Sequence, residues 1–172
     1  ISLGFVLVVI DYCRTWPRLE RLVKFLLLMG GAAAVIAIGL WLLPDSTANS
    51  ALNALTRLGY PGGWVIRYIE ENPELSERAI GTSVDPNSLG GLLLMIGALI
   101  GPQVVTRQPL FRRPLVLLIA GLVIVALILT FSRGAMLGLA AGLGFVALTR
   151  YRRLLPWLAL AALLLLVLPI TQ

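Results

Sequence analysis

The sequence contains no histidine, one cysteine and few charged residues. Without histidine, neither an imidazole general base nor a histidine-ligated metal centre can be built from this chain. Cys13 has no second cysteine with which to form an intramolecular disulfide. Charged residues make up 13% of the 172 residues, whereas about 25% is usual for soluble domains. These absences exclude a disulfide scaffold and a disordered tail, and they argue against a soluble enzyme.

The sequence contains long apolar runs. Hydrophobic residues make up 59% of the chain and the mean hydropathy is +0.94. About 20 apolar residues suffice to cross a bilayer as a helix. Five runs approach this length: 25–43, 88–106, 115–131, 134–149 and 154–170. Residues 1–10 resemble the end of a sixth run. The sequence predicts an all-α, multi-pass transmembrane helical bundle that forms one domain over 1–172. Five buried helices of a soluble protein are the disfavoured alternative.

The connections between these runs alternate in charge. Every second connection is basic, and together these hold ten of the fourteen basic residues: Arg14, Arg18, Arg21, Lys24, Arg107, Arg112, Arg113, Arg150, Arg152 and Arg153. The other connections hold four arginines and six acids. The positive-inside rule places the first set in the cytoplasm. The net charge of +6 therefore reflects membrane topology, not nucleic-acid binding, and the 44–87 loop is expected on the extracytoplasmic side of the membrane.

The 44–87 loop carries local signals of structure. Asp45 begins a stretch with leucines near helical spacing, which predicts a short amphipathic helix on the membrane surface. The glycines and proline of 59–63 predict a turn. Residues 65–71 are expected to form a second short helix, because Pro73 follows them.

Small residues recur at four-residue spacing in two of the runs. They are Gly97 and Gly101, and then Gly134, Gly138 and Gly142. Such rows let helices approach closely in lipid. Packing within the bundle is the favoured interpretation, ahead of dimerisation. Pro102 lies inside a run and is expected to kink it.

Two motifs are expected at the outer, extracytoplasmic face, at 77–88 and 130–135. The helices that follow them both run inward, so both present their N-termini there. A helix N-terminus carries unpaired N–H groups and about half a positive charge, which favours anions. Asp85 is expected to cap the first helix, with Pro86 at its first position. Ser132 is expected to cap the second, and Gly134 leaves its backbone open to close approach.

Each of these helix starts carries an arginine, Arg78 or Arg133. Arginine binds phosphate through a planar fork, so two such groups beside two helix N-termini suit a diphosphate. Simpler roles remain open: Arg133 as an interfacial snorkelling residue, and Arg78 as the partner of Glu74 or Glu77. The neighbouring acids are expected to be a solvated run. No Asp-x-Asp pair occurs, so a metal-dependent sugar-nucleotide site gets no support, and neither metal nor cofactor is expected.

The two motifs resemble those of the bacterial O-antigen ligase and O-antigen polymerase family. The matching stretches are Arg78-Ala-Ile-Gly81 followed by Asp85-Pro86-Asn87, and Leu129-Thr-Phe-Ser132-Arg133-Gly134-Ala135. The resemblance covers roughly 77–149. It implies a bundle similar to that of GT-C glycosyltransferases. It also implies transfer of a glycan from undecaprenyl diphosphate to a sugar hydroxyl, on lipid A core or another glycan. The resemblance places this reaction at the periplasmic face of a bacterial inner membrane.

The resemblance also implies roles for particular residues. Arg78 and Arg133 would hold the diphosphate and act in catalysis, with Ser132, Gly134 and Asn87 as further binding residues. The family's proposed base is a histidine in a large periplasmic loop, which this sequence lacks. We therefore expect the chain to be an internal segment of a longer protein. The alternatives are a transporter and a non-enzymatic membrane scaffold.

Overall fold

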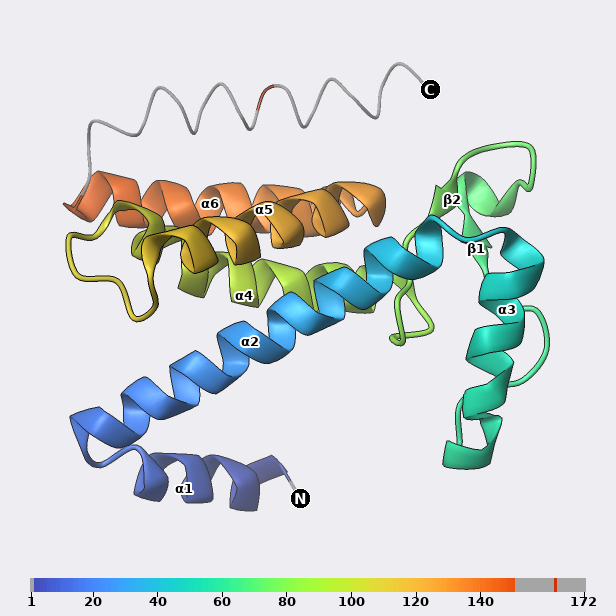
Figure 1. The fold of residues 1–172 in the computed structure, drawn as a ribbon. Helices are drawn as coiled ribbons and strands as arrows, with labels where there is room; N and C mark the ends of the chain where they lie inside the picture. The colour runs from blue at the N-terminus through green and yellow to red at the C-terminus, as the bar shows by residue number, and fades with distance from the viewer. Residues whose placement is uncertain (1, 151–162, 164–172) are drawn as a thin grey trace.

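The computed structural model describes residues 2–150 and residue 163, and this part of the chain is mostly helical (Figure 1). The longer helices are α1 (Ser2–Tyr12), α2 (Trp16–Trp41), α3 (Asp45–Asn53), α4 (Pro86–Val105), α5 (Arg113–Leu129) and α6 (Arg133–Arg150). Between α3 and α4 lie η1 (Ala54–Leu58), β1 (Arg67–Tyr68), η2 (Ile69–Glu71) and β2 (Glu77–Arg78). The mostly helical character predicted from the sequence is thus confirmed, with one short strand pair that was not predicted.

Five of the helices overlap predicted apolar runs. Helices α2, α4, α5 and α6 overlap the runs at 25–43, 88–106, 115–131 and 134–149, and α1 overlaps the run at 1–10. The run at 154–170 lies outside the described residues, except for Leu163. Within the described part, α2 and α4 are long and apolar enough to cross a membrane by length and composition. Helix α5 is apolar but shorter.

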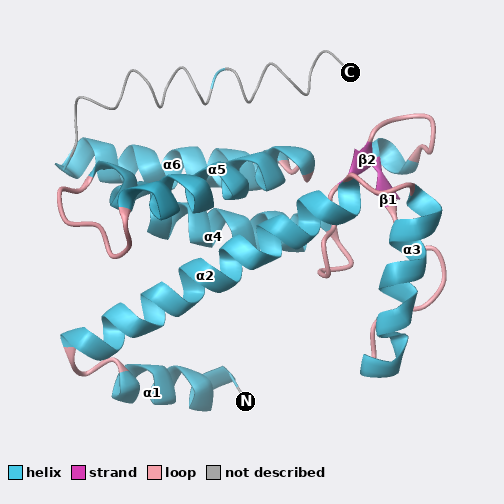
Figure 2. Ribbon diagram, in the orientation of Figure 1, coloured by secondary structure: helices cyan, strands magenta, loops and turns pink. Residues whose placement is uncertain are grey.

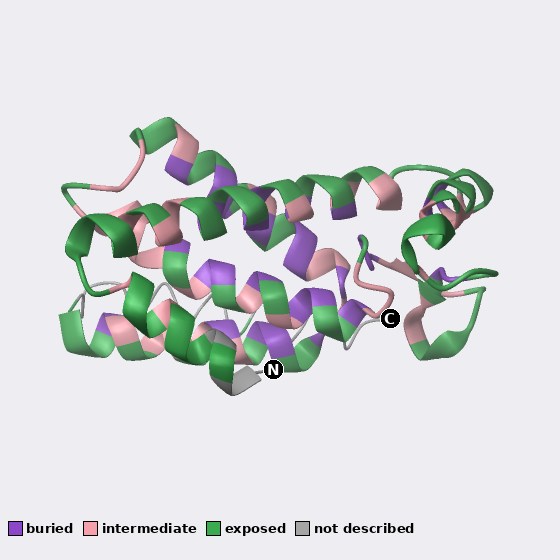
Figure 3. Ribbon diagram, turned by 90° about the horizontal axis from the view of Figure 1, so that it is seen from below, coloured by how far each residue is buried: buried purple, intermediate pink, exposed green. Residues whose placement is uncertain are grey.

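Helix α4 is the centre of the bundle. It packs against α5, α6 and α2, and α2 also packs against α5. The core between them holds fully buried side chains from three helices, such as Leu27, Leu93 and Val123. Buried positions face the inside of the bundle and exposed ones face outward (Figure 3). The hydrophobic periodicity is therefore satisfied by helix-on-helix packing.

Glycines allow the closest helix contacts. A Cβ on Gly97 would lie 2.8 Å from Leu139 of α6, and Cβ atoms on Gly101 and Gly138 would also overlap leucines of the facing helix. These three positions serve packing between α4 and α6, as favoured from the sequence. A Cβ added to Gly134 or to Gly142 would meet no atom within 4 Å. Pro102 lies in the last turn of α4, which continues to Val105.

The segment between α2 and α4 forms a small unit across one end of the bundle. Helix α3 begins at Asp45 and runs crosswise to α5 and α6 (Figure 1). A second apolar cluster, centred on Leu52, Val65 and Ile80, holds the unit together.

The helix predicted at 65–71 is wrong over most of its length. Residues Arg67–Tyr68 pair antiparallel with Glu77–Arg78, with Arg67 opposite Arg78 and Tyr68 opposite Glu77 (Figure 2). Val65, Ile66 and Tyr68 are β-branched or aromatic, and such residues favour strands. Only Ile69–Glu71 forms a short helical turn, in which Glu70 and Glu71 have φ of 54° and 57°.

Candidate functional site

Four chain segments meet at one end of the bundle: the end of α2, strand β2, the start of α4 and the turn from α5 to α6. Strand β2 is fixed against the ends of α2 and α5 by two hydrogen bonds. The indole Nε1 of Trp41 donates to the carbonyl of Glu77 at 3.1 Å. The backbone N–H of Ala79 donates to the carbonyl of Leu129 at 2.7 Å. These two bonds set the position of Arg78, which lies between the two anchored residues.

Arg78 connects the starts of α4 and α6. Its Nε donates to the carbonyl of Thr130 at 2.8 Å, and its Nη2 donates to Oδ1 of Asn87 at 3.1 Å. Thr130 lies in the turn before α6, and Asn87 in the first turn of α4. Within the described residues Arg78 forms no salt bridge with Glu74 or Glu77, so that simpler role is not observed. The arginine and Asn87, both predicted as binding residues, are in contact.

The guanidinium of Arg78 keeps its charge and part of its donor capacity. Partial burial lowers the pKa of Arg78, and the nearby carboxylate of Asp85 acts in the opposite direction. The ordinary pKa of an arginine is so far above neutral that the side chain stays protonated at neutral pH. A guanidinium has five N–H donors, so three remain beyond the two bonds to protein oxygens. A fixed cation with unused donors is suited to an anionic ligand.

The start of α4 is capped as the sequence predicts. Oδ2 of Asp85 accepts hydrogen bonds from the backbone N–H and the hydroxyl of Ser88, at 2.8 and 3.0 Å. Pro86 occupies the first helical position. Burial acts to raise the pKa of Asp85, but the bonds from Ser88 and Asn87 and the charge of Arg78 hold it below its usual value. The cap is therefore ionised at neutral pH.

The turn from α5 to α6 is short and strained. Phe131 has φ of 50°, a left-handed conformation that costs roughly 1–3 kcal/mol for a residue other than glycine. Thr130 is fully buried. Its hydroxyl donates to the carbonyl of Leu127 at 2.7 Å and accepts from the N–H of Ser132 at 3.2 Å. The carbonyl of Ser132 accepts the first bond of α6, from Met136 at 3.0 Å. The turn presents Arg133 and Gly134 at the exposed start of α6.

The two helix starts touch at Gly90. A Cβ on Gly90 would lie 3.0 Å from the Cβ atoms of both Ser132 and Ala135. Ser132, predicted as a binding residue, is therefore buried against α4, while Arg133 and Gly134 are exposed. The topology expected from the sequence, with two adjacent helix N-termini at one end, is what the structure contains.

The sequence did not predict that acidic residues, Asp45 and Glu77, lie near each other at this end of the bundle. Strand pairing places Tyr68 opposite Glu77, and the hydroxyl of Tyr68 donates to Oδ2 of Asp45 at 2.5 Å. Burial, with the charge of Asp45 second, raises the pKa of Glu77 to about 7. The hydrogen bond to Asp45 is the main cause that raises the pKa of Tyr68 to about 12. Glu77 is thus partly buried, and not a member of a solvated run.

The sequence also did not predict the hydrogen bonds of Trp41 and Thr130 to the strand that carries Arg78. Thr130 belongs to the second motif, but nothing in the sequence links it to an arginine 52 residues earlier. The part of the chain that the structure describes contains no cluster of acids, cysteine or histidine able to hold a metal ion. No protein-family model, no curated protein and no solved structure matches this chain.

Proposed function

We propose that this chain is a segment of a membrane glycosyltransferase of the O-antigen ligase or polymerase type. The reaction transfers a glycan from undecaprenyl diphosphate to a sugar hydroxyl, on lipid A core or on another glycan. It takes place at the periplasmic face of a bacterial inner membrane. The observation that carries the proposal is the position of Arg78, held between the starts of α4 and α6 with donors to spare.

The exposed surface of the bundle supports a membrane location. Large apolar side chains of α2, α5 and α6 are exposed, including Phe25, Met29, Leu118, Ile124 and Phe145. Soluble proteins rarely expose contiguous apolar surface of this extent. In a bilayer the same side chains contact lipid, and no further protein is needed to cover them.

The charges support one orientation. The start of α2, the connection from α4 to α5 and the end of α6 lie together at one end of the bundle. Among the described residues, they carry seven basic ones: Arg18, Arg21, Lys24, Arg107, Arg112, Arg113 and Arg150. The six acids of the 44–87 loop are at the other end. The positive-inside rule then assigns Arg78 and Arg133 to the periplasmic face, where lipid-linked glycans are used.

The site suits the departure of a diphosphate. In the proposed transfer, the acceptor oxygen bonds to the anomeric carbon as the bond from that carbon to the diphosphate breaks. Negative charge grows on the leaving diphosphate. Arg78 is a positioned cation, Arg133 is an exposed cation at the start of α6, and the N-termini of α4 and α6 are fixed dipoles. Together they would stabilise this charge electrostatically. Asn87, Ser132 and Gly134 line the same helix starts.

Substitution of the arginines in the full-length protein tests this role. We expect Arg133→Ala and Arg78→Ala to abolish glycan transfer while the protein still inserts. Arg133→Lys should also transfer poorly, since an ammonium does not replace the planar fork. Arg57→Ala, an exposed arginine elsewhere in the 44–87 loop, is the matched control. Normal glycan transfer by a well-expressed Arg133→Ala protein would contradict the proposed role of Arg133 in holding the diphosphate.

A transporter is the other candidate, and the structure gives it little support. Transporters place ionisable groups near the membrane midplane. In the described part of the chain, α4, α5 and α6 contain no ionisable residue between their first and last positions. Substrate transport by reconstituted protein in the absence of any glycan would favour this alternative.

A further inference from the structure

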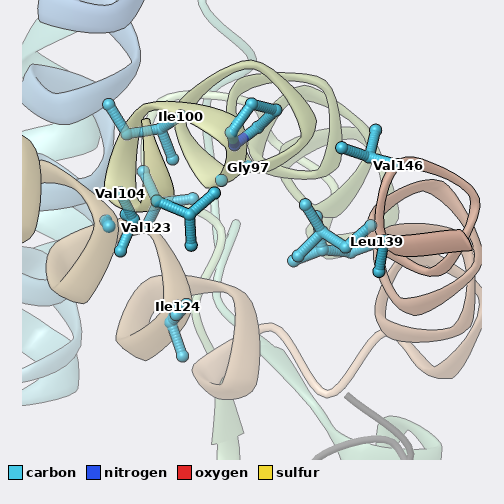
Figure 4. Close-up of a pocket in the computed structure, with 13 residues that line it drawn as sticks. Gly97, Ile100, Val104, Val123, Ile124, Leu139 and Val146 are labelled. Carbon is cyan, nitrogen blue, oxygen red and sulfur yellow. The ribbon is translucent and has the colours of Figure 1, made fainter. Parts of the chain in front are cut away.

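The arginine-rich end of the bundle contains an apolar cavity that the proposed transfer reaction does not use. Its volume is about 250 Å³, and it lies between the second half of α4, the middle of α5 and the part of α6 from Leu139 to Ala147 (Figure 4). Gly97, Val104, Val123 and Leu139 are among its lining residues. It exists because α4 packs closely on both α5 and α6, whereas α5 and α6 share few contacts. A cavity lined only by apolar groups does not attract water and suits a hydrocarbon.

Positive charge adjoins this cavity. Nη2 of Arg113 donates to the carbonyl of Val104, a lining residue, at 3.3 Å. Arg107 follows the lining residue Val105 by two positions, and Arg150 follows Ala147 by one helical turn. The cavity therefore lies beside Arg113, and Arg107 and Arg150 are close in sequence to residues that line it.

No acidic side chain neutralises these arginines. The sequence contains no aspartate or glutamate after Asp85. The two acids at this end, Asp11 and Glu20, are in salt bridges with Arg14 and Lys24, at 2.9 and 2.6 Å. An apolar cavity beside arginines without acidic partners is complementary to a ligand with a hydrocarbon chain and an anionic head.

We propose that this cavity holds part of an acyl chain of an anionic phospholipid, whose phosphate contacts Arg113 with Arg107 and Arg150 nearby. The volume decides how much of the lipid fits, because pockets for whole drug-sized ligands measure about 300–1,000 Å³. One chain segment enters and the rest of the lipid stays in the bilayer. This inference rests on the membrane location of α4, α5 and α6, and is independent of the diphosphate site.

Lipid retention by the purified full-length protein tests the proposal. Phosphatidylglycerol and phosphatidylcholine with matched chains are offered in nanodiscs or detergent, and bound lipid is counted by native mass spectrometry. We expect one phosphatidylglycerol to be retained in preference to phosphatidylcholine. Each arginine near an anionic headgroup contributes about fivefold to affinity, so Arg113→Gln should lower retention about fivefold. Arg57→Gln makes the same charge change at the opposite end and should have no effect.

A paired substitution tests the cavity itself. Ala120→Phe places a ring in the cavity, whereas Gly121→Phe places it where a Cβ meets nothing within 4 Å. We expect at least a tenfold loss of phosphatidylglycerol with Ala120→Phe and none with Gly121→Phe. Equal retention of the two lipids by the unmodified protein, or unchanged retention by Ala120→Phe, would overturn the proposal.

A photoactivatable acyl chain supplies a test that needs no substitution. A phosphatidylglycerol with a diazirine in its chain should label peptides of α4, α5 and α6 that line the cavity. Labelling confined to the outward faces of α2 or α5 contradicts the proposal, since it shows only bulk lipid. All these readouts are independent of glycan transfer, so failure here leaves the roles of Arg78 and Arg133 unaffected, and the reverse also holds.

Discussion

The two ends of the bundle hold their arginines in different ways. At the end where α4 and α6 begin, Arg78 is partly buried and bonded to two protein oxygens on different segments. At the other end, Arg107, Arg112 and Arg150 are exposed, and Arg113 reaches a single backbone carbonyl. A positioned arginine gives geometric selectivity, whereas a surface group supplies charge that orients the chain in a membrane. Substitutions at the first end should therefore have large, local effects.

The largest effect is expected where the starts of α4 and α6 touch. Gly90→Leu must push Ser132 and Ala135 away, because even its Cβ would lie 3.0 Å from theirs. Overpacking of this kind costs about 1–3 kcal/mol or more, and it separates the two helix starts. We expect a clear loss of thermal stability and no glycan transfer.

Gly91→Leu is the matched control for this change. A Cβ at Gly91 meets nothing within 4 Å, so the same side chain is tolerated one residue along the helix. Thermal unfolding followed by circular dichroism in detergent compares the two proteins. Equal stability and equal transfer would show that the contact at Gly90 does not hold the helix starts together.

The sequence predicts the helices better than the site, and the reason is physical. Apolar runs mark α2, α4, α5 and α6 directly, and Asp85-Pro86 is a local cap signal that depends on neighbouring residues alone. The contact of Arg78 with Thr130 joins residues 52 positions apart, and no local pattern encodes it. The pairing of β1 with β2 is also short and involves charged residues, so it lacked the alternation that identifies strands.

The second largest effect is expected at Arg78. Arg78→Ala removes both bonds of the guanidinium. A buried hydrogen bond from a charged group contributes about 1.5–3 kcal/mol, but Arg78 is only half-buried and solvent weakens its bonds, so we expect a loss of about 1–2 kcal/mol in total. Arg67 is its partner in the strand pair but is exposed, so Arg67→Ala should change the free energy of unfolding by less than about 0.5 kcal/mol. Denaturant or thermal unfolding of both variants measures the difference. Similar losses for the two arginines would contradict the structural role of Arg78.

A smaller effect is expected at the cap of α4. Asp85→Ala removes the acceptor of the bonds from Ser88, and loss of such a cap costs about 1 kcal/mol. It also removes a carboxylate that stabilises the charged form of Arg78. Asp85→Asn keeps an oxygen acceptor and should restore most of the stability. An Asn variant as unstable as the Ala variant would show that the charge, and not the hydrogen bond, is what matters.

The smallest effect is expected from the protonation of Glu77, because the carboxyl is only partly buried and water screens its charge. This effect distinguishes the two faces of β2. The folded pKa of about 7 lies above the value of an unfolded glutamate, so the folded state binds more protons between about pH 4.5 and 7. The contribution of Glu77 to stability is therefore fully present below that range and falls as the pH rises through about 7. The groups that face it are Asp45 and Tyr68, and both belong to the 44–87 unit.

Glu77→Gln should flatten the pH dependence of stability near pH 7 and raise stability above it, because the amide stays uncharged beside Asp45. Trp41, whose indole bonds to the carbonyl of Glu77, provides a fluorescence signal for the same strand. Glu74→Gln, an exposed acid in the same connection, is the control and should leave the pH profile unchanged. An unchanged profile in Glu77→Gln would mean that burial at β2 does not govern this carboxyl. Because Arg78 is the next residue on the strand, a flattened profile with unchanged glycan transfer would show that the two faces of β2 act independently.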